Sequence, residues 1–329
     1  MRFRLFPCAF AALVSLAACA AGSRDETTHF TLFDGEQAGA ARVLDSLLLR
    51  GEAVDGLPLV ELSDLAWDRR NRRLYLVSDD GYLFVARVAF ERDRLKSLRF
   101  VAAHRLRDRR GRALRGDAAD AEGLAIAGWD ARGEPELLVS FEHGARILRY
   151  SAEGRWLERL RLPKPLRRAK AYRGKNHQLE ALAWHPRFGV LTAAERALKR
   201  DRKRIQRVFS LDGRSWRFPA WRRKKAAITA IEVTADGNLL LLERAWAGIP
   251  SPVHIGLRKL YLLERPEGGE TRVESLAAWS TGDGWRLDNF EGLTRLDADR
   301  YLLVSDNNEA LLQNSLLVLI ELNGETNGR

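Results

Sequence analysis

Apolar and polar positions follow a pattern that recurs five times between about residues 60 and 310. Each copy has a short segment that opens on a polar residue, a turn, and a very apolar segment that ends in an acidic residue. The copies occupy 63–67 with 74–79, 122–126 with 137–142, 180–184 with 190–195, 229–233 with 239–243, and 291–294 with 301–306. Short apolar runs bounded by turn residues predict pairs of β-strands.

A repeat of this length, with four short strands to a copy, is typical of a β-propeller blade. Candidate outer strands follow the pairs at 82–90, 147–150, 156–162 and 257–263. The second segment of each pair is apolar throughout, as expected where neighbouring blades pack on both faces of a sheet. Connections too short for repeated crossover helices disfavour an α/β fold. We predict an all-β protein with a single β-propeller of five or six four-stranded blades.

The way in which the ring closes leaves the blade count open. Either a sixth blade is present in degenerate form, or the apolar strand at about 41–50 completes the last blade. In the second case this strand lies beside 316–322 and pins the two ends of the domain together.

The N-terminal segment has the features of an export signal. Two arginines, Arg2 and Arg4, precede an apolar stretch at 5–18 that is too short to span a bilayer as a helix. The stretch ends in 16–19 (LAAC), which resembles the bacterial lipobox, in which the cysteine is acylated. We therefore expect a lipoprotein signal peptide at 1–18, a lipidated Cys19 with a short tether to residue 28, and a propeller domain at 29–329. The alternative is an ordinary signal peptide in which Cys19 occurs by chance.

The expected anchor sets the compartment and the partners. Stable anchoring needs more than one acyl chain, which a lipobox cysteine receives. Ala20 follows the cysteine, and by resemblance to Gram-negative lipoproteins this favours the outer membrane. We expect a lipid-anchored protein of the cell envelope that faces the periplasm and is monomeric. Of the two cysteines, Cys8 leaves with the signal and Cys19 carries lipid, so the mature domain has neither a disulfide nor a thiol nucleophile.

The charge balance raises the question of nucleic-acid binding. The net charge is +11, and basic residues cluster at 105–115, 161–175, 199–207 and 222–225. Such runs occur in nucleic-acid-binding proteins, but no motif of a nucleic-acid module accompanies them. We expect no nucleic-acid partner and interpret the runs as solvated surface in contact with anionic headgroups.

Acidic residues mark the same end of every strand pair. In an antiparallel hairpin the start of the first strand lies beside the end of the second. The pattern therefore predicts eight carboxylates around one end of the central channel: Asp79, Glu122, Glu142, Glu180, Glu195, Glu243, Glu291 and Asp306. Like charges at such distances repel unless they are compensated.

Two kinds of compensation are open. Ca²⁺ takes 6–8 oxygen ligands. Four side-chain amides are near enough in sequence to add to the carboxylates: Asn176, Asn289, Asn307 and Asn308. Alternatively, Arg196 and Arg244, which follow two of the acids, pair with carboxylates. A third possibility is structural: an acid at a strand end holds neighbouring blades together through backbone N–H groups.

Other candidate chemistry at this end is limited. His143 and His177 are near the acids in sequence and are candidates, with Glu122 and Glu180, for general acid or base catalysis. The chain has no Gly-x-Ser-x-Gly elbow and no P-loop, so serine-hydrolase chemistry has no motif behind it. The tryptophans are expected to pack between blades, with a place at the channel mouth as the alternative: Trp67, Trp129, Trp184 and Trp216.

Several motifs together resemble the family known as "esterase-like activity of phytase". They lie at 120–124 (DAEGL), 176–182, 241–244 (LLER), 289–293 (NFEGL) and 303–308 (LVSDNN), so the resemblance covers about residues 60 to 310. The family is similar to β-propeller phytases, which bind several Ca²⁺ ions at the channel mouth and hydrolyse phosphomonoesters. The chain departs from the pattern at Ser63 and Thr229, which replace the opening Glu, and no dense phosphate-binding motif can be placed at the mouth.

The resemblance implies a Ca²⁺-dependent hydrolase of phosphate or carboxylic esters with a small-molecule substrate. Glu122, Glu180, Glu291 and Asp306 would be ligands or bases, and the other acids would complete the ring. The alternative is a non-catalytic propeller that binds a ligand or a protein at the envelope. A calcium-dependent lactonase is a third possibility.

Overall fold

The structure is a computed structural model, and it describes residues 27–30, 32, 37–50, 53–174, 177–264, 269–306 and 315–323. Within these residues the only helices are four short 3-10 turns: η1 (Gly116–Ala118), η2 (Lys164–Leu166), η3 (Ala169–Ala171) and η4 (Thr281–Asp283). In this part of the chain no helix has both the length and the apolar character needed to cross a membrane. The expectations for four residues fall outside the described residues: Cys19, Asn176, Asn307 and Asn308.

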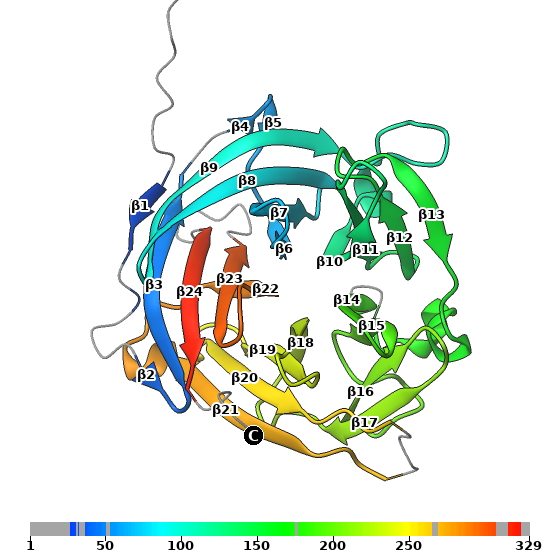
Figure 1. Cartoon of the computed structure of the whole chain (residues 1–329). Helices are drawn as coiled ribbons and strands as arrows, with labels where there is room; N and C mark the ends of the chain where they lie inside the picture. Colours follow the sequence, from blue (N-terminus) through cyan, green and yellow to red (C-terminus); the bar gives the residue numbers. More distant parts are fainter. Residues whose placement is uncertain are drawn as a thin grey trace, which may run out of the picture.

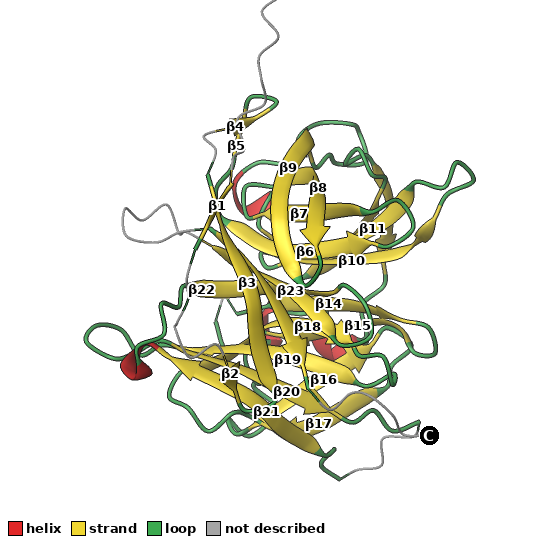
Figure 2. Cartoon of the chain, turned by 60° about the vertical axis from the view of Figure 1, so that its left-hand side comes forward, coloured by secondary structure: helices red, strands yellow, loops and turns green. Residues whose placement is uncertain are grey.

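The strands form five sheets around a central axis (Figure 1), and Figure 2 shows the short loops that join them. Blade 1 is β6 (Leu62–Asp68), β7 (Arg73–Ser78), β8 (Tyr82–Glu91) and β9 (Arg94–Arg105). Blade 2 is β10 (Ala121–Trp129), β11 (Pro135–Phe141), β12 (Arg146–Tyr150) and β13 (Trp156–Leu160). Blade 3 is β14 (Leu179–His185), β15 (Gly189–Ala194), β16 (Ile205–Ser210) and β17 (Ser215–Pro219). Blade 4 is β18 (Ala226–Val233), β19 (Leu239–Ala245), β20 (His254–Leu260) and β21 (Val273–Ser280).

Blade 5 joins the two ends of the domain. Its inner strands are β22 (Asn289–Arg295), β23 (Arg300–Asp306) and β24 (Leu316–Leu322), and its fourth is β3 (Ala41–Leu49) from the N-terminal side. The pairing of β3 with β24 runs from Leu48 opposite Leu316 to Ala41 opposite Leu322. The short strands β1 (Thr27–His29) and β2 (Gln37–Ala38) extend this sheet, and β4 (Ala53–Val54) pairs with β5 (Leu57–Pro58). Closure by the N-terminal strand is therefore confirmed, and the six-blade alternative is wrong.

The core lies between neighbouring blades. Leu239, Leu240, Leu241 and Leu242 of β19 are all fully buried because adjacent blades cover both faces of the sheet. Trp216 is also fully buried among the side chains of blades 3 and 4, as predicted from its sequence. This packing fixes the inner strands, which carry the channel residues.

Two glycines allow the inner strands to approach closely around the channel. A Cβ atom at Gly123 would lie 2.5 Å from the backbone oxygen of Glu180 in the next blade. A Cβ atom at Gly292 would lie 2.7 Å from the side chain of Leu65 across the closure of the ring. Distances this short are not compatible with a side chain, which explains the glycine after the opening Glu in these two blades.

Candidate functional site

One end of the channel is formed where the inner strands begin. In all five blades the pairing of the first strand with the second shifts register at this point. The residues at the shifts are the openers of the repeated pattern: Ser63, Glu122, Glu180, Thr229 and Glu291. A bulge takes a side chain out of the regular in-and-out alternation of a strand. The openers are thereby separated from the core positions that follow them.

The ends of the second strands lie beside the openers, as the antiparallel geometry predicts. The backbone N–H groups of Asp79, Glu142 and Glu195 each donate to the carbonyl oxygen two residues before the opener of the same blade, at 3.1, 3.1 and 3.2 Å. In blade 5, Asn289 pairs directly with Asp306. Backbone hydrogen bonding thus brings the opener and the acid at the end of the second strand to one place in each of these hairpins.

Carboxylates from different blades meet at this end. Oxygen atoms of Glu122, Glu142 and Glu180 lie within 4.8 Å of one another, and so do oxygen atoms of Asp79, Asp120 and Glu122. Glu122 belongs to both groups. We call the converging set the acidic mouth; it consists of Asp79, Asp120, Glu122, Glu142, Glu180, Glu195, Glu291 and Asp306.

The carboxyl groups at the centre of the acidic mouth lack enough positive charge. Burial raises the pKa of Glu122 well above its usual range, and repulsion by Glu180 raises it further. Burial and then repulsion by Glu195 raise the pKa of Glu180 in the same way. The pKa of Glu142 is raised to about 7 by burial and by Asp120. Neither Glu122 nor Glu180 forms an ion pair with a described residue, so a cation or protons must balance their charge.

The two histidines each contact an acid of the mouth. The His143 Nδ1 atom hydrogen-bonds the Asp120 carboxylate and lies 4.0 Å from the Glu142 Oε2 atom. The hydrogen bond to Asp120 is the main cause of a raised pKa at His143. The His177 Nδ1 atom contacts the Glu195 carboxylate. The hydrogen bond to Asp120 orients the His143 ring, which leaves its Nε2 atom as the position for proton transfer.

Arginine pairing compensates only the side of the mouth near blades 3 to 5. Arg244 of β19 donates from Nη1 to the Glu291 Oε1 atom at 2.9 Å, across to the next blade. Even so, burial holds the pKa of Glu291 at about 7, with Arg244 opposing the rise. The Arg196 Nε atom lies 3.6 Å from the Glu195 Oε1 atom.

Glu243 does not join the acidic mouth, which corrects the expectation from the sequence. Arg258 of β20 binds both of its carboxylate oxygens, and the Nη2 to Oε1 distance is 2.8 Å. Glu243 is only 1% exposed, so this is an ion pair inside blade 4. Burial raises the pKa of Glu243, and the arginine opposes that rise.

Two polar residues near the mouth, Asp120 and Ser63, were missed as site residues, whereas a third, Asn289, was expected there as an amide ligand. Asp120, two residues before the Glu122 opener, lies in one group with Asp79 and Glu122 and in another with Glu142 and His143. The sequence could have indicated Asp120, because it precedes the opening Glu in the Asp-x-Glu-Gly sequence of blade 2. Ser63, which replaces the opening Glu in blade 1, donates its hydroxyl to Asp79. Asn289 donates from Nδ2 to the Glu291 Oε1 atom at 2.7 Å.

The structural role considered for the opening acids is filled by Asp64 instead. This buried carboxylate accepts backbone N–H bonds from Leu65 at 2.8 Å, Leu124 at 2.7 Å and Leu293 at 3.1 Å. These three donors belong to blades 1, 2 and 5. Asp64 therefore links these three blades through backbone hydrogen bonds.

A strongly basic pocket adjoins the acidic mouth between blades 3 and 4. Its volume is about 520 Å³, and its lining includes His177 and Arg196, which both lie against Glu195 of the acidic mouth. The other cationic side chains of the lining come from three of the basic runs noted in the sequence. Arg173 donates to backbone carbonyl oxygens, and the remaining four are Lys199, Lys203, Arg223 and Lys225. These four side chains are exposed and form no ion pair with a described residue. The structure thus supplies basic residues near the mouth that could not be placed there from the sequence.

Fold and site together define a five-bladed propeller whose channel mouth carries buried acids beside a basic pocket. The chain belongs to the phytase-like family described as "esterase-like activity of phytase", whose model matches residues 58–309. Membership of this family indicates a propeller of hydrolase type. A solved structure described as "Structure of Dos1 propeller" is similar at 8% identity and a TM-score of 0.35, over 86% of this chain and 74% of that chain. None of the curated proteins matches the sequence.

Proposed function

We propose that the protein is a metal-dependent hydrolase of phosphate or carboxylic esters, and that Ca²⁺ is its metal. The observation that carries this proposal is the pair of central carboxyls, Glu122 and Glu180, which are crowded by other acids and form no ion pair with a described residue. A dry cluster of this kind is costly unless a cation neutralises it.

The donor set suits a hard cation. Two of the candidate groups at the acidic mouth offer carboxylate oxygens alone, and the other two each add a histidine. Ca²⁺ prefers oxygen ligands. Asp79, Asp120 and Glu122 would hold one ion, and Glu122, Glu142 and Glu180 would hold a second. When bound, such an ion polarises an ester oxygen and lowers the pKa of a coordinated water.

The side chains around the mouth would bind and orient the substrate. Lys199, Lys203, Arg223 and Lys225 line one side, where they would form charge-assisted hydrogen bonds with a phosphate or carboxylate group. His177 lines this pocket, and its Nδ1 atom contacts the Glu195 carboxylate. It would transfer a proton at Nε2 to the leaving oxygen.

A second proposal concerns location. We propose that Cys19 is acylated and anchors the propeller in the cell envelope, facing the periplasm. The lipobox-like sequence at 16–19 supports it. Mass spectrometry of the N-terminal peptide tests it: a diacylglyceryl cysteine as residue 19 is expected, and an unmodified thiol there would contradict it.

A non-catalytic binding propeller is the alternative function, and one observation favours it. His143, His177 and Arg244 already contact Asp120, Glu195 and Glu291, so part of the acidic mouth is balanced by the chain itself. In that case the mouth would hold a cationic ligand or partner without turnover.

Hydrolysis assays on metal-stripped protein separate the two functions. We expect added Ca²⁺ to restore cleavage of p-nitrophenyl phosphate or p-nitrophenyl acetate. Glu180→Gln should lower kcat by at least about a hundredfold, as loss of a general base or metal ligand does. Glu158→Gln, the same change on the exposed strand β13, is the matched control and should leave kcat unchanged. Failure of Ca²⁺ to restore cleavage of either ester would favour the binding function.

A further inference from the structure

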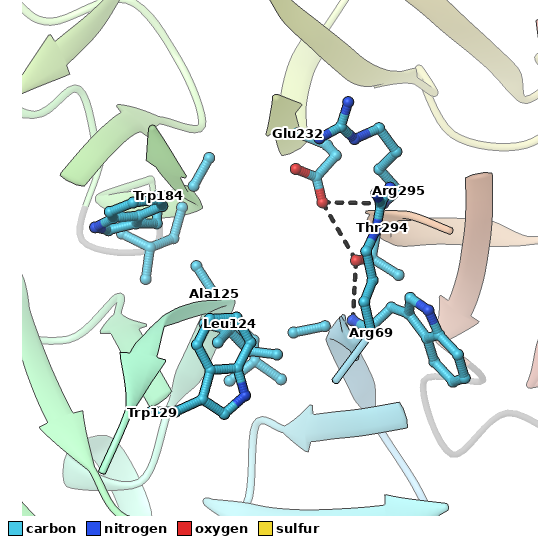
Figure 3. A pocket seen from close by; sticks show the side chains of 13 residues that line it. Arg69, Leu124, Ala125, Trp129, Trp184, Glu232, Thr294 and Arg295 are labelled. Carbon is cyan, nitrogen blue, oxygen red and sulfur yellow. Dashed lines mark hydrogen bonds between the residues drawn. The ribbon is translucent and has the colours of Figure 1, made fainter. Parts of the chain in front are cut away.

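A second cavity lies at the opposite end of the channel, where the inner strands finish. Its volume is about 170 Å³, and its lining comes from β6, β10, β14, β18 and β22 or the residues just beyond them. None of the acidic-mouth residues lines it. We call it the far mouth, and define it by Arg69, Trp129, Trp184, Glu232, Thr294 and Arg295 (Figure 3).

One wall of the far mouth is aromatic. Trp129 and Trp184, from blades 2 and 3, are 43% and 41% exposed, whereas Trp216 is fully buried between blades. Trp129 is fixed by a hydrogen bond from its Nε1 atom to the Asp68 Oδ1 atom at 3.1 Å. In Figure 3 both indoles stand on one side of the cavity. Exposed indoles held in place at a cavity offer flat faces for a ligand.

The opposite wall is polar and already ordered. The Glu232 carboxylate accepts hydrogen bonds from the backbone N–H of Val233 at 2.6 Å and of Arg295 at 3.0 Å, and from the Thr294 hydroxyl at 3.2 Å. Thr294 in turn accepts from the backbone N–H of Trp67 at 3.0 Å. Figure 3 shows this chain of hydrogen bonds facing the two indoles. The carboxylate is thus held in one orientation without a ligand, which lowers the entropic cost of binding.

Positive charge exceeds negative charge at this wall. Arg69 and Arg295 both line the cavity with Glu232. The Arg69 Nη2 atom is tied to the Asp297 carbonyl oxygen at 3.1 Å. Partial burial and then repulsion by the charge of Arg295 lower the pKa of Arg69, and the charges of Glu232 and Asp297 oppose this fall. An anionic group placed between them would relieve that repulsion.

We propose that the far mouth binds a single sugar unit that carries a carboxylate. The C–H groups on one face of a sugar ring are slightly positive and pack on the negative face of an indole. Sugar hydroxyls donate to Glu232, and a carboxylate takes the guanidinium groups of Arg69 and Arg295, which match its geometry. A purely apolar ligand would remove water from Glu232 and the arginines without offering them new hydrogen bonds, and a neutral sugar would offer no negative charge to the two guanidinium groups.

The test is to titrate glucuronate into the purified full chain. Calorimetry and tryptophan fluorescence measure the binding. We expect saturable binding, with glucose and benzoate each at least about tenfold weaker because each lacks one of the recognised features. Trp184→Ala and Glu232→Gln should each weaken binding by about tenfold or more. Trp246→Ala is the matched control, because this indole is 47% exposed but does not line the cavity.

The outcomes separate this site from the acidic mouth. Glu122→Gln should leave glucuronate binding unchanged, so the inference survives even if the proposed hydrolase activity is absent. Absence of saturable glucuronate binding would overturn the inference. So would an equal loss in Trp246→Ala and Trp184→Ala, or tighter binding of benzoate or glucose than of glucuronate. Thermal unfolding of each variant distinguishes lost binding from lost folding.

Discussion

The acidic mouth should make the metal-free protein less stable as the pH rises from about 5 to 8. The clearest single contributor is Glu291, whose pKa is raised from 4.5 to about 7, mainly by burial. Because the folded-state pKa is the higher one, the folded protein holds the proton more tightly than the unfolded chain. The resulting stability is fully present below about pH 4.5 and is lost as the pH rises through about 7.

The size of the effect follows from the two pKa values. The difference between 4.5 and about 7 corresponds to about 3 kcal/mol once the group is fully ionised. Glu142, with a pKa raised to about 7, acts in the same direction. His143 does so too, because its raised pKa also means that the folded state binds the proton more tightly. The glutamine in the Glu291→Gln variant cannot ionise, so this variant lacks the contribution of Glu291 to the pH dependence of the free energy of unfolding.

Urea unfolding in EDTA at pH 5, 6, 7 and 8 measures this dependence. We expect the free energy of unfolding of the wild type to fall over this range, and the Glu291→Gln variant to lose less. Saturating Ca²⁺ should flatten the wild-type curve, because a bound cation keeps the carboxylates ionised at little cost. A free energy that rises with pH, or an identical slope in the variant, would refute the reasoning about burial and charge at the mouth.

The remaining predictions concern separate parts of the fold. Gly123→Ala should destabilise the protein by about 1–3 kcal/mol in thermal unfolding, because its Cβ would meet a backbone oxygen of the next blade at 2.5 Å. In the same strand, a Cβ atom at Gly128 would have no other atom within 4 Å, so Gly128→Ala should change stability by well under about 1 kcal/mol. An equal loss of stability in the two variants would contradict the close approach of the blades at Gly123. Glu243→Gln should lower the free energy of unfolding by about 3–5 kcal/mol, because it removes the charge that pairs with the buried Arg258, but it should not alter Ca²⁺ affinity. Weaker Ca²⁺ binding by this variant would show that Glu243 contributes to the acidic mouth. Lys199→Ala with Lys225→Ala should raise KM for a phosphate ester by at least about tenfold, and an unchanged KM would rule out the basic pocket as the substrate-binding side.

The architecture and the acidic mouth could be predicted because both follow from local pattern. The apolar second segments required cover on both faces, which a blade provides. The hairpin geometry then brought Glu142 beside Glu122 and Glu195 beside Glu180 with no knowledge of how the blades pack. The pairing of the strand at 41–50 with the last blade could be predicted in the same way, because an apolar strand needs a partner and the last blade has an open edge.

The features that could not be predicted depend on contacts between distant segments. Glu243 looks like the other acids in sequence, but Arg258 on the next strand faces it across the sheet and takes both oxygens. Lys199 and Arg223 come together only because loops of blade 3 meet the start of blade 4. Trp184 and Trp216 are the same residue type, but Trp216 is buried and Trp184 is exposed. The difference depends on whether side chains of a neighbouring blade pack over the indole.

The central claim, a metal site at the acidic mouth, is tested most directly by titration of Ca²⁺ into metal-stripped protein in a calorimeter. The wild type should show saturable binding, and Glu122→Gln should lose it or weaken it by at least about tenfold, because Glu122 belongs to both carboxylate groups. Glu158→Gln should bind as the wild type does. Absence of Ca²⁺ binding by the wild type, or binding that Glu122→Gln leaves intact, would contradict the account.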